Sequence, residues 1–262
     1  MQPVINIALR AARQANEFIQ HSLSHMDFSN VDPQSNQKKL SQLQTAVYRI
    51  FFDALKKAYP THYIAEIGAM DADGKDNSWH LYFHADNAAI RSLPLTAYSL
   101  IYKIKGRAEH TIVVNALTNE EFSASRTHNA SVNGRRMRVS EPRNLEHAYV
   151  HTNILEKARG EKRHIALDLL NDLDASVAGI RVTGCSAIDL AWVAAGKVDA
   201  AVIIDPDMDE LAGVMLLCQE AGALAGTFNG GPASRNSRQL VVANSKIFKS
   251  LLQRLHTFEG RL

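Results

Sequence analysis

The sequence predicts an α/β protein with two lobes, an α+β lobe followed by an alternating α/β lobe. Two amphipathic helical segments come first, and several short strand-like runs with turn signals between them follow. After Pro142, strand-like and helical segments alternate along the chain. No flexible linker separates the two halves, so we expect one domain over residues 1–262, with lobes at about 1–142 and 143–262 and a cleft between them.

The first lobe begins with helical segments. Residues 4–23 carry apolar side chains at helical spacing and predict a helix. The polar stretch 26–42, which contains Asp32-Pro33, favours a loop. A second helix is expected at about 41–58, and it ends before Pro60 because the residue before a proline disfavours the helical conformation.

Short strands complete the first lobe. They are expected at residues 63–66, 97–104, 110–114, 121–125 and 130–132. Lys105-Gly106-Arg107 lies between the runs 97–104 and 110–114 and indicates a hairpin. Asn133-Gly134 is a strong turn dipeptide after the last of them. Residues 71–78, around Gly74, read as an exposed loop.

The second lobe alternates between the two kinds of element. Strands are expected at residues 149–153, 180–183, 200–204 and 240–242, and helices at 161–172, 186–195, 210–220 and 245–255. Gly196 follows directly on the second of these helices, where glycine commonly ends a helix. This alternation is typical of strands connected by helices that cover a sheet.

The composition excludes several classes of protein. The chain has 262 residues, 46% of them hydrophobic, which suffices for a sizeable core. Lys and Arg number 29 against 27 Asp and Glu, so no overall basic field indicates nucleic-acid binding. No apolar run is long enough to cross a membrane, and the first residues have no signal-peptide core. With only Cys185 and Cys218, both expected as thiols, we predict a cytoplasmic protein.

Several segments, in this order and spacing, resemble the inositol monophosphatase superfamily and within it the bacterial SuhB branch. They are Ile5-Asn-Ile-Ala-Leu-Arg-Ala-Ala-Arg13, Lys105-Gly-Arg107, Phe122-Ser-Ala-Ser-Arg126, Asn133-Gly134, the long run from Arg181-Val-Thr-Gly-Cys-Ser-Ala-Ile-Asp189 to Asp199, Leu211-Ala-Gly213 and Glu220-Ala-Gly222. The resemblance implies an αβαβα layered sandwich that forms a homodimer. It also implies a Mg²⁺-dependent hydrolase of small sugar phosphates, in which several carboxylates converge on the metal ions.

Most of the family's metal ligands are replaced here. Glu66 matches a family glutamate and Asp209 the aspartate of a W-D pair, while Asp86 is a displaced third candidate. The two aspartates of the family's D-P-x-D motif become Tyr82 and Ala85 when counted from Trp79, or Leu81 and His84 when counted back from Pro94. Three further acidic positions of the family are taken by Leu43, Ile67 and Val202.

The resemblance therefore implies a phosphatase frame without a full catalytic set. The leading hypothesis is a catalytically degenerate, SuhB-like regulatory protein that binds the transcription antitermination machinery, namely RNA polymerase and Nus factors. The alternative is an active Mg²⁺-dependent phosphatase with a site rebuilt from Glu66, Asp86 and Asp209. A third hypothesis is a sensor that binds a phosphorylated metabolite without cleaving it. Gly184, Cys185 and Ser186 are the substrate-binding candidates.

Other residues leave two interpretations open. The acids at 205, 207, 209 and 210 form either a cation site or helix-capping groups. His80 and His84 are candidates for zinc or for packing, and Tyr82 and Phe83 either fill the vacated site or bind a ligand. The basic run 135–138, with Arg143, is either a solvated edge or a patch that contacts protein or RNA.

Overall fold

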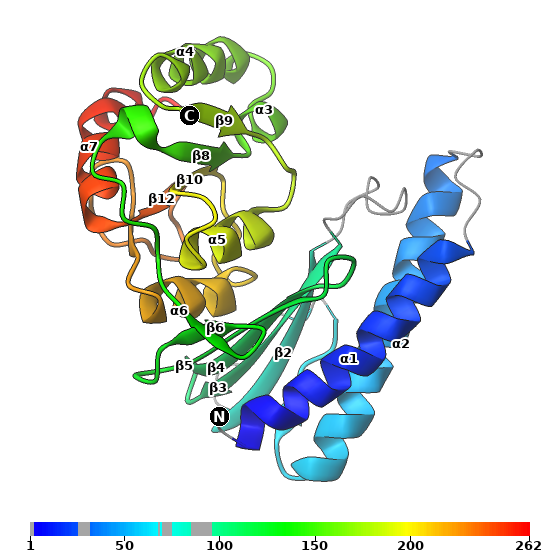
Figure 1. The fold of residues 1–262 in the computed structure, drawn as a ribbon. Coiled ribbons are helices and arrows are strands. Elements are labelled where there is room, and N and C mark those ends of the chain that lie inside the picture. Colours follow the sequence, from blue (N-terminus) through cyan, green and yellow to red (C-terminus); the bar gives the residue numbers. More distant parts are fainter. Residues whose placement is uncertain (1–2, 26–31, 68, 70–74, 85–95) are drawn as a thin grey trace.

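Helices and sheets stack in five layers in the computed structural model (Figure 1), which describes residues 3–25, 32–67, 69, 75–84 and 96–262. Helices α1 and α2 form the first layer, followed by a seven-stranded sheet. Helices α5 and α6 separate this sheet from a five-stranded one, which helices α4 and α7 cover on its far side. The predicted αβαβα sandwich is therefore confirmed.

The outer pair of helices buries one apolar face each against the first sheet. Helix α1 spans Pro3–Ser24 and helix α2 spans Pro33–Ala58. The early start of α2 corrects the expected loop at residues 26–42: Asp32 is the N-cap, its carboxylate accepts from the Ser35 amide at 2.8 Å, and a proline occupies the first turn. Proline is favoured there because its missing N–H would have no helical partner.

The seven-stranded sheet runs in chain order from β1 to β7, with only β1 and β2 parallel. Its strands are β1 (Tyr63–Ile64), β2 (Asn77–His84), β3 (Ala97–Ile104), β4 (Arg107–Asn115), β5 (Glu120–Ser125), β6 (Ala130–Val132) and β7 (Arg135–Met137). Lys105 and Gly106 both have positive φ, as the tight turn of a two-residue hairpin requires, so the predicted hairpin is confirmed.

The second sheet has the order β11-β12-β10-β8-β9, with β8, β9 and β10 parallel. Its strands are β8 (Tyr149–Thr152), β9 (Gly179–Arg181), β10 (Ala200–Ile204), β11 (Leu224–Gly226) and β12 (Gln239–Ala243). The remaining helices are α3 (Ile154–Lys157), α4 (Lys162–Asp174), α5 (Ser186–Ala194), α6 (Ala212–Glu220) and α7 (Ser245–Leu255), with short 3₁₀ turns at Leu145–His147 and His256–Phe258. The carboxyl ends of parallel strands are where α/β proteins commonly bind ligands.

The middle layer, helices α5 and α6, packs against both sheets. Helices α5 and α6 fill the space between the two sheets with a continuous apolar cluster. Cys218 lies within it and is fully buried, and burial raises the pKa of its thiol to about 12 although a backbone hydrogen bond lowers it. Both cysteines are buried thiols that form no disulfide, as expected.

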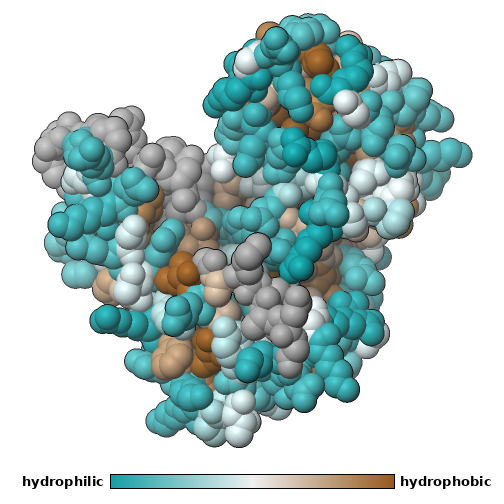
Figure 2. Space-filling view, turned by 180° about the vertical axis from the view of Figure 1, so that it is seen from behind, coloured by the Kyte–Doolittle hydropathy of each residue, from teal (hydrophilic) through white to brown (hydrophobic). Residues whose placement is uncertain are grey.

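The face of the molecule drawn in Figure 2 is mostly hydrophilic. In Figure 2 the hydrophobic residues on the face turned toward the viewer form small, separate areas. Among the described residues, no helix is both long and apolar enough to span a bilayer.

Candidate functional site

A cavity of about 490 Å³ opens where both sheets and the middle helices meet. It is lined by Phe83, His84, Asn153, Glu156, Lys157, Gly184, Cys185, Ser186, Ala187, Asp205, Pro206, Asp207, Glu210 and Leu211. We call it the cleft. It lies at the carboxyl ends of the parallel strands β8 and β10, because Asn153 follows β8 and Asp205 follows β10. Asn153 joins these two ends by accepting from the Ile204 amide at 2.8 Å and donating to the Ile204 carbonyl at 3.0 Å.

His84 is the centre of the polar contacts in the cleft. Its Nδ1 lies 2.5 Å from Glu210 Oε1, and its Nε2 lies 2.9 Å from Ser99 Oγ. The Cys185 thiol donates to the His84 carbonyl at 3.8 Å. With both ring nitrogens occupied and only 8% of the residue exposed, His84 is not a metal ligand in this arrangement. It is a packed histidine that joins the first sheet to the segment before α6.

Glu210 is kept ionised by its neighbours. Burial alone raises the pKa of this carboxyl, but the hydrogen bond and charge of His84, together with the charge of Lys157, bring it below the ordinary value. The charged carboxylate therefore persists through the neutral range. Sequence reasoning did not single out Glu210 as a partner for His84, because 126 residues separate them and no local motif connects them.

The neighbouring acids are each bound elsewhere. Asp205 forms an ion pair with Arg238 at 2.7 Å, and Asp209 forms one with Arg235 at 2.6 Å. Asp207 accepts from the backbone amides of residues 209 and 210 at 3.1 and 3.0 Å, so its role is to cap the turn that leads into α6. This supports the capping interpretation of the acidic cluster.

Two of the three residual metal candidates, Glu66 and Asp209, lie outside the lining of the cleft. Glu66 is exposed just beyond β1, and neither it nor Asp209 lines the cavity. Asp86 and Ala85 lie outside the described residues. Among the residues that the structure does describe, no group of three or more His, Cys, Asp or Glu side chains could hold a metal ion, which also removes support for zinc at His80 and His84.

Two of the positions predicted to replace family acids lie in the apolar core. Leu43 is 4% exposed in the cluster beneath α1 and α2. Val202, on β10, is fully buried in the cluster formed with helices α4 and α7. Phe83 lines the cleft whereas Tyr82, its neighbour on β2, does not. Gly184, Cys185 and Ser186 all line the cleft at the start of α5, and their role in binding stays a prediction.

A buried polar network supports the start of α5. Asp189, in the first turn of the helix, lies 2.6 Å from His151 Nδ1 on β8 and accepts from the Thr183 hydroxyl at 2.7 Å. Asp189 is 1% exposed and His151 is 5% exposed. The Thr183 hydroxyl also accepts from the Cys185 amide at 3.2 Å, so this network fixes the segment that carries the binding candidates.

Five alternating layers with a cleft at the strand ends define the class of layered α/β sandwiches, and the comparisons with known proteins place the chain within it. Residues 90–259 match the Inositol monophosphatase family. The chain is 36% identical to the Nus factor SuhB of Pseudomonas aeruginosa, over 96% of this chain and 95% of that protein. It is 31% identical to the Nus factor SuhB of Escherichia coli K12, again over 96% and 95%. The chain therefore belongs to the inositol monophosphatase family.

Solved structures agree on the fold. The extragenic suppressor protein SuhB of Bartonella henselae superposes with a TM-score of 0.81 at 24% identity, covering 97% of this chain and all of that one. An inositol monophosphatase of Thermotoga maritima superposes with a TM-score of 0.81 at 20% identity, over 98% of each chain. At these identities the likeness establishes the architecture, while the chemistry rests on the residues of the cleft.

Proposed function

We propose that this chain is a SuhB-like regulatory protein that acts by binding partners of the transcription machinery and does not hydrolyse phosphate esters. The observation that carries the proposal is the His84–Glu210 pair, which occupies the part of the cleft where one alignment count places a metal-binding aspartate of the family. A histidine side chain has no oxygen for a hard cation, and both ring nitrogens of His84 are already engaged.

The metal that the family implies does not fit the described donors. Mg²⁺ requires near-octahedral coordination by oxygen atoms. A protein usually holds it with one or two carboxylates, and waters complete the shell. Here Asp205 and Asp209 face arginines, Asp207 accepts backbone amides and Glu210 faces His84. Breaking these contacts to bind an ion would leave two guanidinium groups without their carboxylates, which opposes binding.

The partner follows from the relatives. Proteins that match over nearly the whole chain are named Nus factors, and we propose that this chain likewise binds Nus factors or RNA polymerase. A homodimer is the proposed state of the chain, with a mass near twice its 28.9 kDa.

The test is a binding experiment with purified components. The immobilised chain is exposed to RNA polymerase and to each Nus factor of its own organism, with Mg²⁺ and then with EDTA. We expect saturable binding to at least one of them at micromolar concentration, equal in both buffers. Glu66→Gln and Asp209→Asn are matched variants that should bind like the parent. Absence of binding to every component, or binding abolished by EDTA, would contradict the proposal.

A further inference from the structure

A second pocket, of about 540 Å³, lies at the far end of the seven-stranded sheet on the side that faces α1. It is lined by Ile5, Ser123, Ala124, Ser125, His128, Asn129, Ala130, Ser131, Gly134 and Arg136. We call it the serine pocket. None of its residues lines the cleft, so it is a separate site.

Strand register explains why polar groups gather there. Ser123 lies opposite Ser131, and Ser131 lies opposite Arg136, so their side chains share one face of β5, β6 and β7. Phe122, an alternate residue of β5, points the other way into the apolar cluster beneath α5 and α6. The face toward α1 is thus polar where a packed sheet would carry Val or Ile.

The hydroxyls of the serine pocket supply hydrogen-bond donors. Ser123 Oγ and Ser131 Oγ are 2.9 Å apart, and Ser125 Oγ is 2.8 Å from His110 Nδ1. Only one proton lies between the two serine oxygens, so the second hydroxyl directs its own proton to another acceptor. Ser123 and Ser125 are each 6% exposed, and side chains so buried are well ordered for a ligand.

The charge in the serine pocket is positive. Among the described residues, its lining contains no carboxylate, and Arg136 is the one permanently charged residue there. One Nη of Arg136 donates to Asn129 Oδ1 at 2.8 Å, which orients the guanidinium while its other N–H groups remain able to bind an anion. His128 adds a second, titratable nitrogen-bearing ring to the lining.

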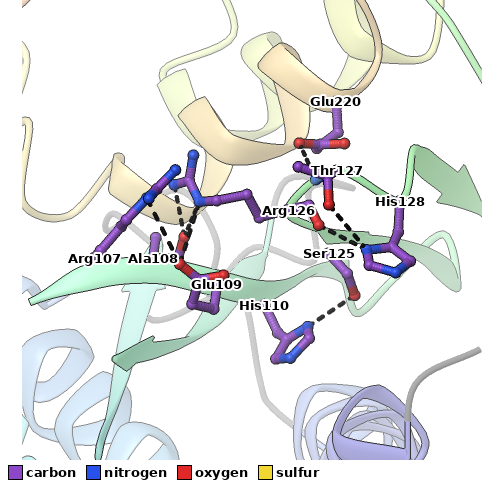
Figure 3. A network of polar contacts seen from close by, with 9 residues as sticks. All are labelled: Arg107, Ala108, Glu109, His110, Ser125, Arg126, Thr127, His128 and Glu220. Atoms are coloured by element: carbon purple, nitrogen blue, oxygen red, sulfur yellow. Dashed lines mark hydrogen bonds and ion pairs between the residues drawn. The ribbon is translucent and has the colours of Figure 1, made fainter. Parts of the chain in front are cut away.

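The turn beside the serine pocket is held in a strained shape (Figure 3). Thr127 and Asn129 have φ of 62° and 64°, which is unusual for a β-branched residue such as threonine. Glu220, at the end of α6, accepts from the Thr127 amide at 2.8 Å and from the Asn129 amide at 3.1 Å. In Figure 3 this glutamate approaches from the α6 side of the sheet, and His110 and Ser125 point toward the other side. Glu220 thus holds the turn from the α6 side, and residues 128 and 129 of the turn line the serine pocket.

We propose that the serine pocket binds the phosphate group of a small phosphomonoester. Arginine and clustered hydroxyls match phosphate, which offers several strong acceptor oxygens and a double negative charge. The volume is within the range of small-molecule sites, so a sugar-sized group fits beside the phosphate. Binding at this site is independent of the cleft and of any metal.

The test is calorimetry of the full chain with inorganic phosphate and with ribose 5-phosphate, in EDTA. We expect Arg136→Gln to weaken binding of both probes at least tenfold, because one charge-assisted contact is lost. Ser131→Ala should weaken it a few-fold. Arg135→Gln is the matched control: it removes the same charge one residue away, on the opposite face of β7, and binding should change less than twofold.

Three outcomes would overturn the proposal. In the first, neither probe binds the parent chain. In the second, the two arginine variants lose affinity equally, which would indicate a general charge effect. In the third, Lys157→Gln abolishes binding while Arg136→Gln does not, which would place the anion in the cleft. Circular dichroism of each variant confirms that the compared proteins are folded.

Discussion

Replacing Asp189 by alanine is expected to destabilise the protein by about 3–5 kcal/mol, the range seen when one partner of a buried pair is removed. The carboxylate is 1% exposed and binds both His151 and Thr183. Its loss leaves the buried imidazole and the partly buried Thr183 hydroxyl without this acceptor, and adds a small cavity. At roughly 2–4 °C per kcal/mol for a chain of this size, the melting temperature should fall by roughly 10 °C.

Urea denaturation followed by circular dichroism measures this effect. Asp189→Asn is the matched control, because the amide keeps the shape and one acceptor oxygen, and we expect about 1–2 kcal/mol of destabilisation from the weakened hydrogen bonds. A loss below about 1 kcal/mol for Asp189→Ala, a value ordinary for surface substitutions, would mean that the network does not stabilise the start of α5.

Replacing Gly213 by alanine is the second large effect, and its sign is informative. Helix propensity alone predicts that alanine in α6 stabilises by about 1 kcal/mol. An added Cβ, however, would lie 2.6 Å from both Ile101 Cγ1 and Thr111 Oγ1, on strands β3 and β4. Since α6 packs directly on these strands, the helix must move away, and we expect net destabilisation of about 1–3 kcal/mol.

The measurement is again the free energy of unfolding in urea. Gly213→Val should cost more than Gly213→Ala, since a branched side chain extends further into the sheet. The neighbouring Ala212→Gly, at the first position of the same helix, is a backbone control that should cost at most about 1 kcal/mol. A Gly213→Ala protein more stable than the parent would show that α6 can shift on the sheet without loss.

Local rules predicted much of the fold because most elements carry their own signal. The Lys105-Gly106 hairpin and the alternation after Pro142 were read correctly for this reason. The start of α2 was missed because Asp32-Pro33 signals a helix N-terminus as readily as a turn. Strand β2 was not predicted. Strand β7 was identified only as a basic run, because a three-residue edge strand with two arginines has almost no hydrophobic pattern.

The cleft could be predicted only in part. Gly184 to Ser186 were placed there through the family resemblance, and they do line it. The pairing of His84 with Glu210, and of Asp209 with Arg235, depends on contacts between elements distant in sequence, which no local pattern encodes. Sequence comparison alone therefore kept Asp209 as a metal candidate, whereas the structure pairs it with a guanidinium.

A phosphate-release assay is the direct test of the proposal that this chain does not hydrolyse phosphate esters. The chain is incubated with inositol monophosphate and saturating Mg²⁺, beside Glu66→Gln and Asp209→Asn variants and an EDTA control. We expect no release above the EDTA background and no difference between the parent and either variant, because the family's catalytic groups act as a unit and, under the proposed function, this chain does not assemble them. Mg²⁺-dependent turnover by the parent that is abolished by either substitution would contradict it and establish a rebuilt phosphatase site.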